Sequence, residues 1–554
     1  MPSRCCSTHC VSIAQTYSIG RHFTRRYILS TVPNPFRSIY TPPILVRSQS
    51  SAPSSILRNT AAQSAPMALG YLLSFLSAPV ILAGLGIRQF GIWALTGALA
   101  AYVSLLDLGF GGSLSRFVAV HEADRRACGE YIALGFIAVA CVGACAVVAA
   151  VVGAGPLSRT LHGISSSHMR TVLLSSAVLL VTGMLSNIVS AFAQGRRRMF
   201  APNLGLSIGL VVSFIASIGA IALGANLPDY ALANAGAGIV STLLVTGLVL
   251  RAEGPIPTAW PESARFTDFF GYSLKSQLVR VTDLVNYQTD KIVIAFSVGP
   301  SAAGAYELAN RVAFAARQPG VYSLTALVPT LTVSMSRFGI DHIRRRYARL
   351  MEVVVAFGFP SLFLTAALAP LLLGAWLSQV PAATTPILAA LSVGYIASVS
   401  SGVGYVVGLA AGDPGVAARA ATGTAVANVM LTVALAPAFG LWGVLGGTVL
   451  ALTGGALVQV AMIHRHFLLS FAAYCAAVVP TLRVCALLAA PVAIVSYSGA
   501  INGRGLQASA VIVLSLAYGV AYSRWVVSSG RVPEKVARWM SVKFTAVHRR
   551  LAAF

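Results

Sequence analysis

The chain has 554 residues, of which 56% are hydrophobic and 10% are charged, and its mean hydropathy is +0.78. Soluble domains carry about 25% charged residues, so this composition excludes soluble enzymes, DNA-binding proteins and secreted disulfide scaffolds. Apolar runs longer than about 18 residues are typical of membrane-spanning helices. The sequence therefore predicts an all-α polytopic membrane protein.

The net charge of +24 does not indicate a nucleic-acid partner. The basic residues are mostly Arg and cluster in short segments between apolar runs, where membrane topology places them. A nucleic-acid-binding domain would instead carry a basic face interleaved with aromatic residues. We expect no nucleic acid to bind.

The first 60 residues differ from the rest of the chain. They hold seven Arg, eleven Ser and no acidic residue. One interpretation is an organelle transit peptide. The other, which we favour, is an over-long gene model whose true start lies near Ile56 or Met67. In either case residues 1–60 are expected to be disordered and to carry no core function.

Fourteen apolar segments follow, each long enough to cross a bilayer. They span residues 64–85, 90–112, 130–155, 170–193, 203–224, 230–250, 270–298, 303–335, 347–374, 384–410, 416–437, 440–463, 473–497 and 507–527. Pro480 and Arg483 interrupt the thirteenth segment. Two interpretations stay open: it starts at residue 473, or it starts near Val484 with residues 467–482 along the membrane interface.

The basic residues also predict the orientation. Alternate loops and the two tails carry 29 Lys and Arg on one side of the membrane and 4 on the other. Loops rich in Lys and Arg stay in the cytoplasm, so both termini are expected to be cytoplasmic.

An internal repeat predicts the architecture. The same pattern recurs at a constant offset of 213 positions, with Gly86, Gly91 and Trp93 matching Gly299, Gly304 and Tyr306. Six spans separate the copies, so both have the same orientation, as in transporters built from two parallel lobes with a pseudo-two-fold axis. We expect an N-terminal six-helix lobe over 61–255 and a C-terminal one over 256–466. Two extra helices over 467–527 and a basic cytoplasmic tail over 528–554 follow.

Catalytic and metal-binding motifs are not found in the sequence. It contains no Walker A loop and no HExxH motif, and Leu114 occupies the last glycine position of the nearest match to GxGxxG. The eight cysteines form no CxxC pair or zinc spacing. We predict no catalytic residue, no metal and no cofactor. Transport would then draw on an ion gradient, on the gradient of the substrate or on a partner.

Ionisable residues concentrate in the seventh and eighth spans. A charged side chain at the bilayer centre costs about 2.5–3.5 kcal/mol on insertion scales, so its presence points to a function. The candidates for substrate binding are the cations Lys275, Arg280, Lys291, Arg311 and Arg317. The candidates for ion pairing or coupling are the acids Asp283, Asp290 and Glu307, with Asp107 of the second span. The surplus of cations in these two spans favours an anionic substrate group.

Helical spacing predicts which of these charges pair. Arg280 and Asp283 are three residues apart, and Glu307 and Arg311 are four apart, so each pair can meet on one helix face. Asp290 and Arg311 lie at similar depths, about 12 Å from the same ends of their spans. An ion pair between these two helices is therefore also expected.

Four short motifs connect the chain to a known family. They are AGLGIRQFGIWAL at residues 83–95, LLDLGFG at 105–111, GAYELANR at 304–311 and GLWG at 440–443. These motifs resemble bacterial polysaccharide-repeat-unit flippases, the exporters of O-antigen and capsule units. That family belongs to the multidrug/oligosaccharidyl-lipid/polysaccharide exporter superfamily. The resemblance covers residues 55–465.

The resemblance implies a function. Members have two bundles of six helices around a central cavity, where cationic residues engage the pyrophosphate and sugars of a polyprenyl-linked oligosaccharide. Alternating access then moves the headgroup across the bacterial inner membrane while the lipid tail stays in the bilayer. Membrane lipids and a polysaccharide polymerase or assembly machinery are the implied partners.

Other functions stay open. A lipid II-type flippase would share this cavity chemistry. A cation-coupled multidrug antiporter of the same superfamily would favour a surplus of carboxylates. A membrane polysaccharide polymerase, which is an enzyme, would need a larger outward loop than the sequence provides.

Overall fold

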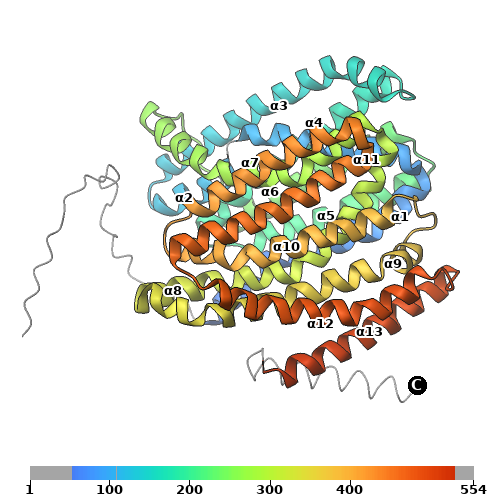
Figure 1. The fold of residues 1–554 in the computed structure, drawn as a ribbon. Helices are drawn as coiled ribbons and strands as arrows, with labels where there is room; N and C mark the ends of the chain where they lie inside the picture. Colours follow the sequence, from blue (N-terminus) through green and yellow to red (C-terminus); the bar gives the residue numbers. More distant parts are fainter. Residues whose placement is uncertain (1–52, 108, 531–554) are drawn as a thin grey trace, which may run out of the picture. The chain divides into compact units, whose positions relative to one another are not determined.

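The computed structural model describes residues 53–107 and 109–530, with side chains from residue 65 onward except at 107, 263, 264, 272, 275, 276, 278–280 and 283. Within this part the chain forms thirteen α-helices, one short 3-10 helix and no strand (Figure 1). In chain order they are α1 (Pro53–Val103), η1 (Ser104–Asp107), α2 (Phe110–Val120), α3 (Arg125–Leu161), α4 (Ser166–Gly195), α5 (Phe200–Ala222), α6 (Leu227–Glu253), α7 (Ser263–Ser297), α8 (Pro300–Ala367), α9 (Ala369–Trp376), α10 (Thr384–Ala410), α11 (Gly415–Phe467), α12 (Phe471–Tyr497) and α13 (Arg504–Ser528). The predicted all-α class is confirmed. Most of the two predicted tails, at 1–52 and 531–554, lies outside the described residues.

Three helices are too long to cross a membrane only once. α1, α8 and α11 have 51, 68 and 53 residues, and at 1.5 Å per residue each far exceeds the bilayer core of about 30 Å. Each contains one glycine with a positive φ: Gly86 (76°), Gly339 (70°) and Gly440 (55°). In α8 the halves run side by side, because the Ser361 hydroxyl donates to the Ala316 carbonyl at 2.7 Å. In α11 an ideal Cβ on Gly447 would lie 2.9 Å from the Thr432 nitrogen. In α1, Ser74 and Phe90 lie on either side of Gly86 and both contact Arg311, so the two halves fold back on each other. All three helices are therefore hairpins of two spans.

The number of crossings follows from these hairpins. Ten stretches of the described chain are long and apolar enough to cross a membrane, and the three hairpins are among them. α7 is not among these ten stretches, because polar side chains interrupt its 35 residues. If each hairpin counts as two crossings and α7 as one, the described helices supply the predicted fourteen crossings. α12 runs unbroken from Phe471 to Tyr497 through Pro480, and the residue at which the thirteenth span begins stays a prediction.

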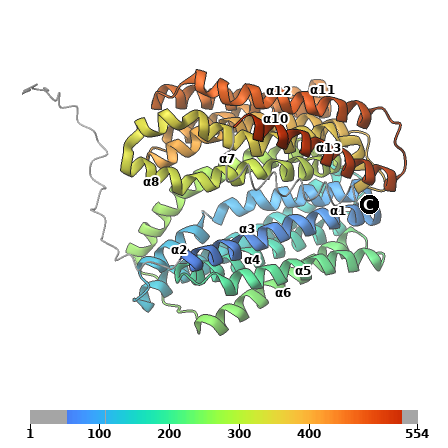
Figure 2. The same cartoon turned by 90° about the horizontal axis from the view of Figure 1, so that it is seen from below.

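The helices of residues 56–530 pack in two groups. α4 packs on α2, α3 and α6, and α6 also packs on α5; α10 packs on α8 and α11, and α11 on α7. Figure 2 shows α3–α6 on one side and α7, α8, α10 and α11 on the other, with α1 between them. α12 lies against α8, and α13 against α9 and α12. The domain limits at residues 255 and 466 stay predictions.

The repeated glycines meet each other across the two groups. A Cβ on Gly91 would lie 1.8 Å from the Pro300 carbonyl oxygen, and one on Gly304 would lie 2.7 Å from the Ile87 carbonyl oxygen. Each glycine thus contacts the backbone that opens the other copy of the repeat. Such reciprocity is what a two-fold axis requires, and only glycine permits backbones to approach so closely.

Candidate functional site

A cavity of about 530 Å³ lies between α1, η1, α7 and α8. Aromatic and amide side chains make up much of its wall. Its lining includes Tyr71, Ser74, Phe75, Ser104, Gln277, Tyr287, Gln288, Glu307, Asn310, Arg311 and Phe314. The ionisable side chains in this lining that could carry charge at neutral pH are Glu307 and Arg311. The cavity therefore contains the residues of α8 that the sequence singled out.

Glu307 holds two cations at the wall of the cavity. Its Oε2 lies 2.6 Å from Lys291 Nζ, and its Oε1 lies 2.8 Å from Arg311 Nε. The predicted pair between Glu307 and Arg311 is confirmed. Arg311 also donates to the Ser74 hydroxyl at 3.1 Å and lies 5.5 Å from the centre of the Phe90 ring. These three ionised groups leave one positive charge in surplus, with Arg311 facing the cavity.

Asp290 is fully buried and takes different partners from those predicted. The Tyr306 hydroxyl donates to Asp290 Oδ2 at 2.5 Å, and Asn428 Nδ2 lies 3.5 Å from Asp290 Oδ1. The predicted ion pair between Asp290 and Arg311 is wrong, because Arg311 binds Glu307 instead. Successive side chains on a helix point in different directions, so Asp290 lies between Tyr306 of α8 and Asn428 of α11, while Lys291 reaches Glu307.

Arg317 lies among aromatic rings, six residues after Arg311 on α8. Its guanidinium is 5.1 Å from the centre of the Tyr287 ring, 5.4 Å from that of Tyr395 and 5.8 Å from that of Phe314. It also donates to the Tyr287 hydroxyl. Aromatic faces attract a guanidinium, so these rings hold the cation beside the cavity.

Four candidates cannot be placed. The side chains of Asp107, Lys275, Arg280 and Asp283 lie outside the described residues. Their roles, and the expected pair between Arg280 and Asp283, stay predictions.

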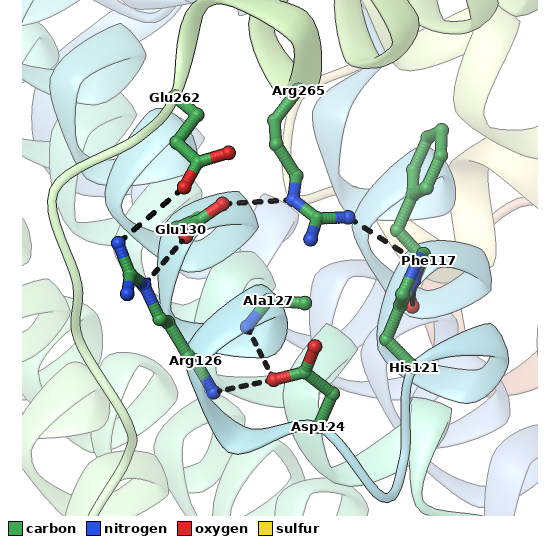
Figure 3. A network of polar contacts seen from close by, with 8 residues as sticks. All are labelled: Phe117, His121, Asp124, Arg126, Ala127, Glu130, Glu262 and Arg265. Atoms are coloured by element: carbon green, nitrogen blue, oxygen red, sulfur yellow. Dashed lines mark hydrogen bonds and ion pairs between the residues drawn. The ribbon is translucent and has the colours of Figure 1, made fainter.

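A second charge network ties α3 to the start of α7. Glu130, whose side chain is 1% exposed, accepts from Arg265 Nε at 2.8 Å and from Arg126 Nε at 3.3 Å (Figure 3). Arg126 also reaches Glu262 at 3.4 Å. Asp124 caps α3, and the backbone N–H of Ala127, followed by that of Arg126, lowers the pKa of its carboxyl. This network joins the first group of helices to the second at one end of the bundle.

The sequence interpretation missed several of these residues. Glu130 lies near the start of α3, where a charged residue does not by itself indicate a buried site. Asn428 and Tyr306 are uncharged, so the search for buried charge passed over them. The local signal available was the polar character of Asn428 within an apolar span of α11.

Comparison with known proteins identifies the family of this chain. A family model for polysaccharide biosynthesis proteins matches residues 56–335, half of the chain. The chain belongs to this family. No protein with a curated description matches the sequence.

Solved structures share the fold of this family member. The lipid II flippase MurJ in an inward closed conformation aligns with a TM-score of 0.62 and 13% identity, over 85% of this chain and 100% of MurJ. An inward-facing multidrug resistance MATE family transporter of the MOP superfamily aligns with a TM-score of 0.60 and 14% identity, over 74% of this chain and 98% of its own. A MOP superfamily transporter from Pyrococcus furiosus gives 0.51 and 14%, over 74% and 95%.

At these identities the likeness shows the fold alone. The family match and the membrane-length helices make this chain a multi-pass membrane protein of the polysaccharide biosynthesis family, with the fold that these solved transporters share.

Proposed function

We propose that this protein flips polyprenyl-pyrophosphate-linked oligosaccharide across the bacterial cytoplasmic membrane by alternating access, for cell-surface polysaccharide assembly. The observation that carries the proposal is the charge at the cavity wall: Arg311 and Lys291 share the single carboxylate of Glu307. This surplus of positive charge suits a pyrophosphate. The family match to polysaccharide biosynthesis proteins supports the same class of substrate.

Arg311 is the residue best placed to engage the pyrophosphate. A guanidinium makes directional, paired hydrogen bonds to phosphate oxygens, whereas an ammonium acts as a point charge. Glu307 holds the Arg311 guanidinium in position at the cavity wall. Arg317, Lys275 and Arg280 would extend the same cationic surface.

Asp290 is our proposed coupling group. Lys291 pairs with Glu307 rather than with Asp290, so the buried carboxylate has no cationic partner among the described residues. The side-chain oxygens of Asn286 and Asn428 are buried near it without a hydrogen-bond partner in the described structure. Such a group of oxygens can accept a proton or a small hard cation. Uptake there would draw on an ion gradient.

The remaining features of the proposal follow from topology. The distribution of basic residues supports cytoplasmic termini. The lipid tail would stay among membrane lipids, and a polysaccharide polymerase or assembly machinery would receive the product. The protein would need no cofactor and would catalyse no bond change.

The test compares Arg311→Ala with two matched variants. Arg311→Lys keeps the charge, and Arg349→Ala removes another arginine of α8, one that pairs with Glu352 at 3.2 Å. Depleted cells complemented with each variant are converted to inside-out and right-side-out vesicles. A lectin that cannot cross the membrane then shows which leaflet holds the lipid-linked oligosaccharide.

We expect Arg311→Ala to leave the oligosaccharide in the cytoplasmic leaflet at normal protein levels, Arg311→Lys to restore part of the transport, and Arg349→Ala to behave as wild type. Normal export by Arg311→Ala would refute the role of Arg311. Depletion that raises retention of cationic dyes, with no accumulation of oligosaccharide, would move the protein to the multidrug antiporters. Accumulation of lipid II would move it to the lipid II flippases.

A further inference from the structure

Gln277 of α7 lines the cavity, and the Leu105 carbonyl determines the orientation of its side-chain amide. Its side chain is 4% exposed, and its Nε2 donates to the Leu105 carbonyl oxygen at 2.7 Å. A carbonyl oxygen can only accept a hydrogen bond, so the amide nitrogen must face Leu105. The amide oxygen, Oε1, is therefore directed away from that contact.

This oxygen is buried and has no hydrogen-bond donor among the described residues. The other amides in the cavity wall differ. Gln288 Oε1 accepts from Lys291 at 2.8 Å, and Asn310 Oδ1 accepts from the Tyr395 hydroxyl at 2.6 Å. Buried acceptors are almost always satisfied, so the open acceptor of Gln277 indicates a donor that comes from a ligand.

The position of Gln277 indicates which part of a ligand it would meet. Eleven residues separate it from Gln288, about 16 Å along α7, and both line the same cavity. Gln288 binds Lys291, which pairs with Glu307, so among the described lining side chains the charged ones lie at the Gln288 end of the cavity. An uncharged acceptor suits a hydroxyl or an amide N–H, and not a phosphate.

Aromatic faces line the same cavity nearer to Gln288. Tyr71, Tyr287 and Phe314 come from three helices, with ring centres 6.3 Å apart for Tyr71 and Phe314 and 5.7 Å apart for Tyr287 and Phe314. Flat aromatic surfaces with a few placed polar groups are typical of small-molecule sites. A sugar ring offers the complement, with apolar faces and hydroxyl donors around its edge.

We propose that Gln277 Oε1 accepts a hydrogen bond from a hydroxyl or acetamido N–H of the substrate's sugar and so determines which glycans the protein accepts. This inference rests on the proposed function. A site built to pair with a donor rejects an analogue that lacks it, because the acceptor is then left buried and unpaired.

The experiment measures binding to the purified full-length protein in detergent. The probes are farnesyl diphosphate alone, farnesyl diphosphate linked to N-acetylglucosamine or to galactose, and the single-deoxy analogues of each sugar. Wild type is compared with Gln277→Met and with Gln277→Asn, which withdraws the amide by one methylene. Gln507→Met is the matched control, since Gln507 lies on α13 outside the cavity lining and its Nε2 likewise donates to a backbone carbonyl, that of Ile501 at 3.2 Å.

We expect wild type and Gln507→Met to bind one deoxy analogue about 5- to 150-fold more weakly than the complete sugar. Each of the two Gln277 variants should bind the complete sugar and the deoxy analogue with affinities that agree within about 2-fold. A uniform loss for every ligand, with discrimination intact, would mean that Gln277 only supports Leu105 and would overturn the proposal. So would wild-type binding that ignores every deoxy change. Failure of wild type to bind any farnesyl diphosphate would instead overturn the proposed function.

Discussion

Gly91→Ala tests whether the reciprocal glycine contact holds this conformation together. The added Cβ would lie 1.8 Å from the Pro300 carbonyl oxygen and 2.6 Å from its carbonyl carbon. Both are backbone atoms and cannot rotate away. Ordinary contact needs nearly twice the first distance, so the hairpin of α1 and the start of α8 must separate.

The magnitude follows from the cost of overpacking. Extra carbon atoms in a packed interior cost about 1–3 kcal/mol, and a clash with backbone belongs at the upper end of that range. A difference of about 3 kcal/mol shifts a two-state population by about 150-fold. We therefore expect Gly91→Ala to favour a conformation in which Gly91 and Gly304 are apart. By the predicted topology, this end faces away from the cytoplasm.

The matched control is Gly97→Ala. Gly97 lies on the same helix, and among the described residues no atom lies within 4 Å of the place that an added Cβ would take. Replacing a helical glycine by alanine there should stabilise the helix by about 0.5–1 kcal/mol.

The assay is the rate at which a membrane-impermeant maleimide labels Ala303→Cys, a position that is fully buried in this conformation, in a background without the native cysteines. We expect labelling at least 10-fold faster with Gly91→Ala than with Gly97→Ala. Equal rates in the two variants would refute the argument that this contact closes the molecule.

Two further predictions concern the charge networks. Arg265→Ala should destabilise the protein by about 2–4 kcal/mol, because it leaves the buried carboxylate of Glu130 with one exposed partner. Arg126→Ala should cost less than about 1 kcal/mol, because the Arg126 side chain is 75% exposed. Thermal unfolding of the purified variants measures this difference, and equal losses would contradict it. Tyr306→Phe removes the hydroxyl that donates to Asp290, so transport by reconstituted protein should change its dependence on pH or sodium while affinity for farnesyl diphosphate is retained. An unaltered dependence would remove Asp290 from the proposed coupling.

The sequence predicted best those features that depend on residues close together along the chain. Apolar runs set the number of crossings, and the four-residue spacing of Glu307 and Arg311 on one helix predicted their pair correctly. Span depth alone did not predict the partner of Asp290. Two residues at one depth meet only if their helices present those faces to each other, and linear spacing does not record that orientation.

Hydropathy and helical periodicity act over neighbouring residues, and they were enough to predict an all-α protein of fourteen crossings with a cationic surplus in its seventh and eighth spans. Three other features emerged only from the packed helices. Tertiary packing paired Glu130 with Arg265, 135 positions away, set Gly91 against Gly304, and turned the side-chain oxygen of Gln277 away from Leu105. Each depends on which helices become neighbours and on their rotation about their axes, and packing over the whole membrane domain settles both.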